Sequence, residues 1–213
     1  MGRTSDAKDR LMQAALSLLW EENYGGVTVD DICKRAEVKK GSFYYFFPGK
    51  AELAVAAIEE VWTSEWKPAL DACFSPSVEP LDRLRNYLQA IVEKQSAVFA
   101  QSGKVLGCPL ASVGCEISTS EADVCGAVRG IFSRKRRYYE SAIRDAVAEG
   151  VIAPCDPAQK ALALHGLIDG LVSQARIMND LAVLTTLPDL GLDLLRANVA
   201  RSDSAARAAT AGV

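Results

Sequence analysis

Residues Thr28 to Lys50 read TVDDICKRAEVKKGSFYYFFPGK, and this stretch decides the fold of the chain. It contains a short segment with helical spacing, a polar break, a second short segment rich in lysine and aromatic residues, and a Pro-Gly stop. Thr28 is a candidate N-cap, and Asp31 three residues later completes a pattern like a capping box. A helix is therefore expected to begin at Val29, with apolar residues at i, i+3, i+4 and i+7 on one face.

The second segment, residues 39–47, suits contact with a DNA duplex. Gly41 has no Cβ, so the backbone at this position can approach a duplex closely. Lysine, serine and tyrosine side chains suit phosphate and base-edge contacts, while the phenylalanines can anchor the segment to a core. Lys50 lies at the start of the next helix, where its ammonium and the free N–H groups can face a phosphate. The residues predicted to contact DNA are Thr28, Lys39, Lys40, Gly41, Ser42, Tyr44, Tyr45 and Lys50.

This pattern resembles the DNA-binding signature of the TetR/AcrR family of bacterial transcriptional regulators, because residue types and spacing agree across two helices and the turn between them. The chain departs from the family pattern with Lys39 where a small hydroxyl residue is common, and with Phe46 where histidine is common. It also has Gly49-Lys50-Ala51 where the family often has Ser-Lys-Glu. The residues that carry the resemblance are Thr28-Val29-Asp30-Asp31-Ile32, Ala36, Val38, Lys40-Gly41-Ser42-Phe43-Tyr44-Tyr45-Phe46-Phe47, Lys50 and Glu52-Leu53.

The resemblance implies an all-α homodimer whose N-terminal three-helix helix-turn-helix domain is followed by a C-terminal helical bundle for effector binding and dimerisation. We expect a DNA-binding domain over 1–49, an effector and dimerisation domain over 50–201, and a disordered tail over 202–213. Two copies of the 39–47 segment would bind a palindromic operator in double-stranded DNA. A small-molecule effector of unknown identity would favour a conformer that no longer fits the operator, which makes the protein a repressor.

Composition limits the class of protein. With 213 residues, 49% of them hydrophobic, the chain can bury a sizeable core. Its net charge of −3 means that any DNA affinity must come from the local placement of cations. No apolar run suggests a signal peptide or a bilayer span, so a cytoplasmic protein without a membrane partner is expected. Six cysteines without a CxxC pair, and a single histidine, argue against a disulfide framework, a metal site or another cofactor.

Helical spacing continues along the chain to about residue 200. A first helix is expected over 6–23, stopped by Gly25-Gly26, and a long helix from Lys50 to about residue 74 should be kinked near Trp66 because Pro68 lacks an N–H. Further helices are expected to end near residues 103, 118, 150, 181 and 200.

Two glycines in the helix expected over 157–181 suggest a dimer interface. Gly166 and Gly170 are four residues apart, close to Leu162, and a glycine inside a helix costs about 1 kcal/mol relative to alanine. Such a cost suggests that the glycines permit close approach of a partner helix. The alternative is that both are merely tolerated inside the chain's own bundle.

Cys108 supports an alternative signal, a thiol sensor. It follows Gly107 at the start of a short helix, where the helix dipole favours a thiolate. The Gly-Cys pair also resembles a subgroup of the family in which such a cysteine senses electrophiles or oxidants. Free cysteines are more often small buried hydrophobic residues, and Cys115 is a possible partner only if it lies nearby.

Two further classes of protein are weighed against a DNA-binding regulator. An enzyme would need a catalytic group, but His165 is the only histidine and its spacing identifies no nucleophile or metal partner. It is expected to be a core or pocket residue, and the chain is not expected to be an enzyme. A dimeric scaffold that does not touch DNA would require the face over 39–45 to be occluded.

Overall fold

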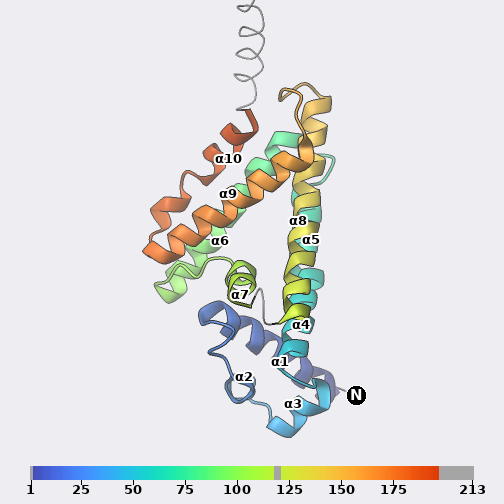
Figure 1. The fold of residues 1–213 in the computed structure, drawn as a ribbon, viewed down its shortest axis with the longest axis vertical. Coiled ribbons are helices and arrows are strands. Elements are labelled where there is room, and N and C mark those ends of the chain that lie inside the picture. Colours follow the sequence, from blue (N-terminus) through green and yellow to red (C-terminus); the bar gives the residue numbers. More distant parts are fainter. Residues whose placement is uncertain (1, 118–120, 197–213) are drawn as a thin grey trace, which may run out of the picture. The chain divides into compact units, whose positions relative to one another are not determined.

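The computed structural model describes residues 2–117 and 121–196, with side chains from residue 6 onward (Figure 1). Within these ranges the chain forms helices and no strand, which confirms the expected all-α class. It divides into two compact units, one made of residues 1–69 and 106–133, the other of residues 70–105 and 134–213. The domain limits drawn at 49/50 and at 201 stay predictions, and the expected tail over 202–213 lies outside the described residues.

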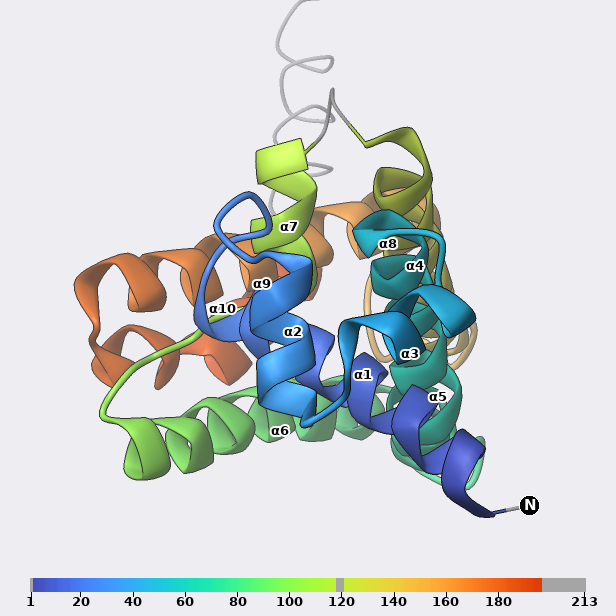
Figure 2. The ribbon, with the colours of Figure 1, turned by 90° about the horizontal axis from the view of Figure 1, so that it is seen from below.

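In the first unit, α1 packs against α2, α3, α4 and α7, and α2 contacts α3 (Figure 2). Apolar side chains from α1 to α4 meet in one core, in which Leu11, Phe43 and Leu53 are fully buried. Burial of a large apolar side chain contributes about 1.5–3 kcal/mol, so this core holds three short helices that would be marginal alone. The bounds are α1 Gly2–Glu21, α2 Val29–Ala36, α3 Lys40–Phe46, α4 Lys50–Val61 and α7 Pro109–Ile117.

Helix α2 begins at Val29, as its capping residues predict. The Thr28 hydroxyl accepts a hydrogen bond from the Asp31 N–H at 3.2 Å, and the Asp31 carboxylate accepts one from the Thr28 N–H at 2.9 Å. The Thr28 hydroxyl also donates to the Asp31 carboxylate, and this bond, followed by the one from the Thr28 N–H, lowers the pKa of Asp31. The helix ends at Glu37, whose φ of 54° lets the Val38 N–H donate to the Cys33 carbonyl at 3.0 Å. The helix is thus capped at both ends.

The helix expected from Lys50 to about residue 74 is interrupted. After α4, a π-helical turn spans Trp62–Trp66, and α5 spans Lys67–Cys73. Pro68 cannot donate a backbone hydrogen bond, and in a regular α-helix its ring would meet the carbonyl four residues earlier. The wider turn avoids this clash, and the Lys67 N–H donates to the Trp62 carbonyl. The irregularity expected near Trp66 is therefore confirmed.

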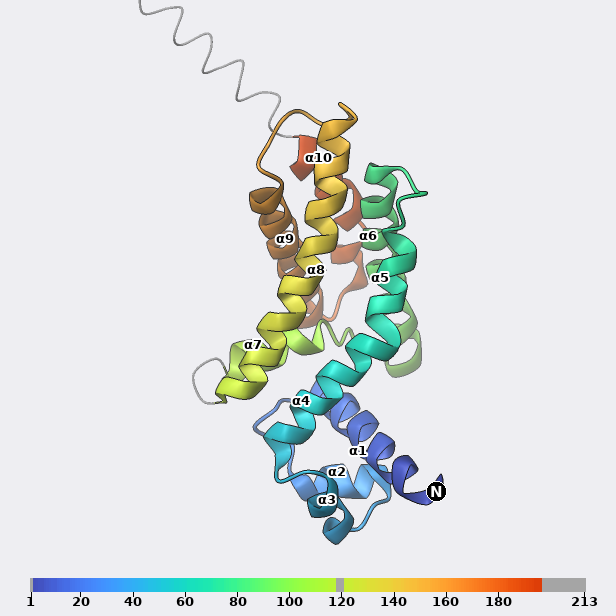
Figure 3. The same cartoon turned by 90° about the vertical axis from the view of Figure 1, so that its right-hand side faces the viewer.

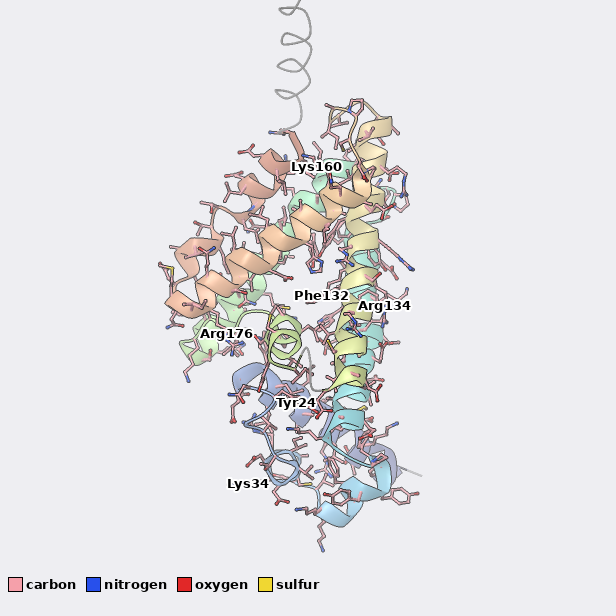
Figure 4. All side chains as sticks on the ribbon, in the orientation of Figure 1. Tyr24, Lys34, Phe132, Arg134, Lys160 and Arg176 are labelled. Atoms are coloured by element: carbon pink, nitrogen blue, oxygen red, sulfur yellow. The ribbon has the colours of Figure 1, made fainter. Side chains whose placement is uncertain are left out.

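The second unit is built from α6, α9, α10, the 3₁₀ turn η2 and the C-terminal part of α8 (Figure 3). Helix α10 packs against α6 and α9. The approach is close at Gly191, where an added Cβ would lie 2.5 Å from Leu88 Cδ1. Lys160 joins α9 to α10 by donating to the Leu194 carbonyl at 2.6 Å (Figure 4). The bounds are α6 Pro80–Ser102, α8 Ala122–Ala148, α9 Pro157–Met178, η2 Leu181–Leu184 and α10 Leu187–Arg196.

A buried arginine fastens the start of α6. Arg83 is 5% exposed. Its guanidinium donates to Asp145 at 2.5 Å, to the Val78 carbonyl at 2.6 Å and to the Pro76 carbonyl at 3.3 Å. A buried guanidinium needs several acceptors to replace its lost hydration, and here a carboxylate of α8 and two loop carbonyls supply them. No sequence pattern pointed to this residue.

Candidate DNA-binding site

Helix α3 presents an exposed aromatic face. On its inner side Phe43 is fully buried and Phe47, just past the helix, is 5% exposed. On its outer side Tyr44 is 53% exposed and Tyr45 is 76% exposed. The Tyr44 ring rests edge-on against Phe43 with a centroid distance of 5.1 Å, so the exposed ring is steadied by the core beneath it. Two rigid aromatic side chains therefore project from a short, well-anchored helix.

The remaining residues predicted on this helix surround the tyrosines. Lys39, Lys40 and Gly41 are exposed and Ser42 is half-buried. The Lys40 ammonium lies 2.8 Å from the Asp30 carboxylate, whose hydrogen bond and charge raise the pKa of Lys40. In the described part of the chain, nothing beyond the local helix backbone lies within 4 Å of the position a Cβ would take at Gly41, so the backbone is open to an approaching surface. The structure thus leaves Lys39, Lys40, Gly41, Tyr44 and Tyr45 accessible, with Phe43 buried beneath them.

Thr28 and Lys50 have structural roles in the free protein. The Thr28 hydroxyl serves in the capping box of α2, through its bonds with Asp31. The Lys50 ammonium donates to the Tyr24 carbonyl at 2.7 Å and to the Val27 carbonyl at 2.9 Å. It also lies 4.1 Å from the centroid of the Tyr24 ring, and partial burial lowers the pKa of Lys50. A phosphate contact by Lys50, predicted from its place at a helix start, stays a prediction.

Sequence reasoning missed a side chain that holds the loop between α1 and α2. The Glu116 carboxylate, from α7, accepts hydrogen bonds from the Tyr24 and Gly25 N–H groups, each at 2.6 Å. The Gly25-Gly26 pair was interpreted only as a helix stop, although adjacent glycines also indicate close approach by another group. A Cβ added at Gly25 would lie 2.8 Å from the Glu116 Oε1 atom.

Cys108 lies immediately before α7 and is half-buried. The preceding Gly107 has a φ of 73°, which a glycine adopts without strain. The Gly107 carbonyl accepts a hydrogen bond from the Trp20 indole N–H at 2.9 Å. Cys115, in the same helix, is exposed. Cys108 is thus next to a bond that ties the start of α7 to the end of α1.

The residues predicted at a dimer interface lie on an exposed apolar strip of α9. Leu162 is 56% exposed, and Ile177 further along the helix is 82% exposed. At Gly166 and Gly170 an added Cβ would meet nothing within 4 Å among the described residues beyond the backbone of α9 itself, so no packing in the described part of the chain requires a glycine at either position. The strip is therefore open to close approach by another helix.

His165 occupies a buried position in α9 and is 6% exposed. Its Nε2 atom lies 3.4 Å from the Asp169 carboxylate. Burial, followed by the positive charges of Lys135 and Arg136, lowers the pKa of His165 to about 4. The imidazole is therefore neutral near pH 7. Among the residues that the structure describes, no group of three His, Cys, Asp or Glu side chains could hold a metal ion.

The core-anchored α3 and the capped α2 before it define a helix-turn-helix protein. Comparison with known families makes the assignment specific. Residues 11–57 match the family described as bacterial regulatory proteins, tetR family, and residues 80–187 match the tetracyclin repressor-like C-terminal domain. The chain belongs to the TetR family and is a DNA-binding transcriptional regulator.

Individual relatives support this assignment. The chain is 32% identical to the transcriptional regulator AcuR of Cereibacter sphaeroides over 173 residues, which cover 80% of the chain and 77% of that protein. It is 25% identical to the repressor NemR of Escherichia coli, over 81% of the chain and 85% of NemR. A crystal structure of a regulatory protein TetR from Rhodobacter sphaeroides superposes with a TM-score of 0.77 and 30% identity, covering 87% of this chain and 96% of that one.

Within the described ranges, none of the helices combines the length and the apolar character needed to cross a bilayer.

Proposed function

We propose that this protein is a homodimeric repressor that binds a palindromic operator through two copies of α3 and leaves it when a small molecule binds residues 50–201. The observation that carries the proposal is the outer face of α3, where Tyr44 and Tyr45 are exposed above a buried Phe43. Large exposed aromatic side chains on a rigid helix are suited to base edges in a major groove. Exposed Lys39 supplies a cation for a neighbouring phosphate.

In this proposal the other predicted residues have different roles on DNA, which depend on the contacts that each makes in the free protein. Lys40 would exchange the Asp30 carboxylate for a phosphate, and Gly41 and Ser42 would let the backbone approach the duplex. Thr28 and Lys50 would contact phosphates while keeping the loop and helix starts in place. Because its target is chromosomal DNA, we place the protein in the cytoplasm, and the proposed function requires no enzymatic activity.

A Tyr44→Ala variant is expected to bind the operator at least roughly thirtyfold more weakly than the parent, because each of the two protomers loses one base-edge contact and each contact contributes about 1–3 kcal/mol. The operator is a duplex selected from a random pool by the parent protein, and affinity is measured by mobility-shift titration at one fixed salt concentration. The matched control is Lys34→Ala, which removes an exposed side chain of α2 outside the predicted contact set (Figure 4). Equal affinities for parent and Tyr44→Ala would rule out α3 as the DNA-binding helix.

A thiol-responsive repressor is the second candidate function. Two observations favour it: Cys108 is half-buried rather than enclosed, and it adjoins the Gly107 carbonyl that Trp20 holds at 2.9 Å. A group added to the Cys108 thiol would lie next to the Trp20–Gly107 hydrogen bond between α1 and the start of α7, and would disturb it. The solved structure of Escherichia coli NemR in its reduced form shares the fold, with a TM-score of 0.76 and 24% identity.

Under this second proposal, a mild oxidant or alkylating agent should release the parent from its operator and leave a Cys108→Ser variant bound. Cys115→Ser is the control, because it removes an exposed thiol from the same helix and should respond like the parent. The measurement is operator affinity before and after treatment, with mass spectrometry to identify the modified cysteine. If Cys108→Ser leaves the operator at the parent's rate, the thiol-responsive function is wrong. The small-molecule effector then remains the proposed signal.

A further inference from the structure

We propose that Glu116 is a positioning residue for DNA recognition, holding the loop between α1 and α2 in the conformation that α2 and α3 require. This inference rests on the proposed function. It concerns a residue of α7 that lies outside the helix-turn-helix segment and 92 residues from its partner Tyr24.

Two charged side chains hold the loop at Tyr24, one through its N–H group and the other through its carbonyl. On the N–H side of Tyr24, the Glu116 carboxylate accepts bonds from Tyr24 and Gly25 at 2.6 Å each. On the carbonyl side, the Lys50 ammonium donates to Tyr24 at 2.7 Å and to Val27 at 2.9 Å. Hydrogen bonds to charged groups are stronger than neutral ones, so the peptide groups around Tyr24 are held between an anion and a cation.

The Tyr24 side chain adds a third restraint. It is 4% exposed, and its ring lies under the Lys50 ammonium at 4.1 Å. Burial, followed by the nearby carboxylates of Glu121, Glu52 and Glu116, raises the pKa of Tyr24 to about 12. Within the described residues the buried Tyr24 hydroxyl has no hydrogen-bond partner, so its burial costs free energy that other contacts must offset. A loop residue buried in this way cannot move without disturbing the residues that hold it.

The position of this loop fixes the position in space of the first turn of α2. Val27, 1% exposed, is held through its carbonyl by Lys50 and precedes Thr28, the N-cap of α2. Helix α3 follows α2 after a short turn and contacts it. A shift of the loop would therefore move the whole helix-turn-helix. DNA recognition tolerates little such movement, because base contacts depend on hydrogen-bond geometry.

The chain also ties the other end of α7 to the same region. Trp20, near the end of α1, donates its indole N–H to the Gly107 carbonyl just before α7. Glu116 lies in the last turn of α7. Both ends of one short helix thus contact the end of α1 and the loop after it.

The test begins with Glu116→Ala and Glu116→Gln in the full-length protein. We expect the Tyr24 and Gly25 amides of Glu116→Ala to exchange with solvent roughly tenfold to a hundredfold faster, because each loses a bond to a charged group. A core amide such as that of Leu53 should keep the parent's rate, which separates a local effect from general destabilisation. Operator affinity should fall roughly tenfold. Glu116→Gln retains one acceptor oxygen and should be intermediate.

Glu121→Gln is the matched control for charge. The Glu121 carboxylate also acts electrostatically on Tyr24 and Lys50, but in the described part of the chain it makes no hydrogen bond to the loop. This variant should bind the operator like the parent. If Glu121→Gln weakens binding as much as Glu116→Ala, charge near Lys50 and not the hydrogen bonds to the loop is responsible.

Gly25→Ala tests the same contact from the opposite side. Its added Cβ would lie 2.8 Å from the Glu116 carboxylate and displace it. We expect Gly25→Ala to weaken operator binding alone and to have little further effect together with Glu116→Ala, since both remove one interaction. Additive losses would overturn the proposal, as would Glu116→Ala with unchanged exchange or unchanged affinity. If the parent selects no duplex, the proposed function itself fails, and the exchange experiment still decides whether Glu116 holds the loop.

Discussion

A Gly170→Glu variant is expected to be a folded monomer that binds the operator roughly a thousandfold more weakly than the parent, because a dimer gains that factor by linking two binding sites. The position is suited to this test. Among the described residues, an added Cβ at Gly170 would meet nothing within 4 Å beyond the backbone of α9 itself, and Gly170 is exposed. Glutamate also forms helices better than glycine, by about 0.5–1 kcal/mol, so the isolated chain should gain stability. Only a partner helix would oppose the substitution.

The measurements are sedimentation equilibrium for the mass and a mobility-shift titration for affinity. Gly126→Glu is the control, because Gly126 is also helical and exposed, with nothing described within 4 Å of an added Cβ outside its own helix backbone, but belongs to α8 and not to the α9 strip of Leu162, Gly166 and Gly170. Gly126→Glu should remain dimeric. A dimeric Gly170→Glu variant with the parent's affinity would show that this part of α9 is not the interface.

Arg83→Ala is expected to lower the free energy of unfolding by roughly 3 kcal/mol, the lower end of the cost of breaking a buried ion pair. The substitution removes the donor that satisfies Asp145, Val78 and Pro76. The estimate is set at the lower end because the Asp145 side chain is 40% exposed and regains water once Arg83 is absent. The two loop carbonyls are left without this donor.

Arg85→Ala provides the control for Arg83→Ala. Arg85 lies two residues further along α6, is about half exposed, and pairs only with Asp82 of the same helix in the contacts described. Exposed pairs contribute about 0–1 kcal/mol, so this variant should unfold close to the parent. Urea unfolding at one protein concentration compares the three proteins. Coincident unfolding curves for Arg83→Ala and Arg85→Ala would mean that the buried guanidinium contributes no more than a surface charge.

The residues behind these two predictions differ in how readily the sequence identifies them. The glycines of α9 could be singled out because a glycine inside a helix carries a known penalty, which raises the question of its use. Arg83 could not be singled out, because the sequence PLDRLRNYL offers two arginines of equal appearance. Only the packing of α6 decides that Arg83 points inward to Asp145, 62 residues later, while Arg85 meets solvent.

Local interactions explain why so much of the DNA-binding segment was predictable. The capping box joins Thr28 and Asp31 within one helical turn, and the apolar spacing of α2 depends only on the helical period. The helical period likewise separates buried Phe43 from exposed Tyr44 and Tyr45 in α3. Each of these features is encoded within a few residues, so the order of the residues is sufficient.

Lys50 shows a limit of predictions made from neighbouring residues alone. Its place at the start of α4 predicted an ammonium facing a phosphate, because helix N-termini favour anions. In the free chain the ammonium donates to the carbonyls of Tyr24 and Val27, two contacts that its place at a helix start did not predict, while the phosphate contact stays a prediction. A helix-start rule describes the backbone groups of that helix alone and carries no information on acceptors supplied by other elements.

The sequence by itself therefore determined the all-α class, the capped helix-turn-helix of residues 28–50 and the family to which the chain belongs. The tertiary structure alone decided that Glu116 holds the Tyr24 and Gly25 amides, that Trp20 meets Gly107, and that Arg83 is buried. The physical reason is the range of the interactions. Helical period and capping act over three to four residues, whereas these contacts join residues 62 to 92 positions apart, which only packing brings together.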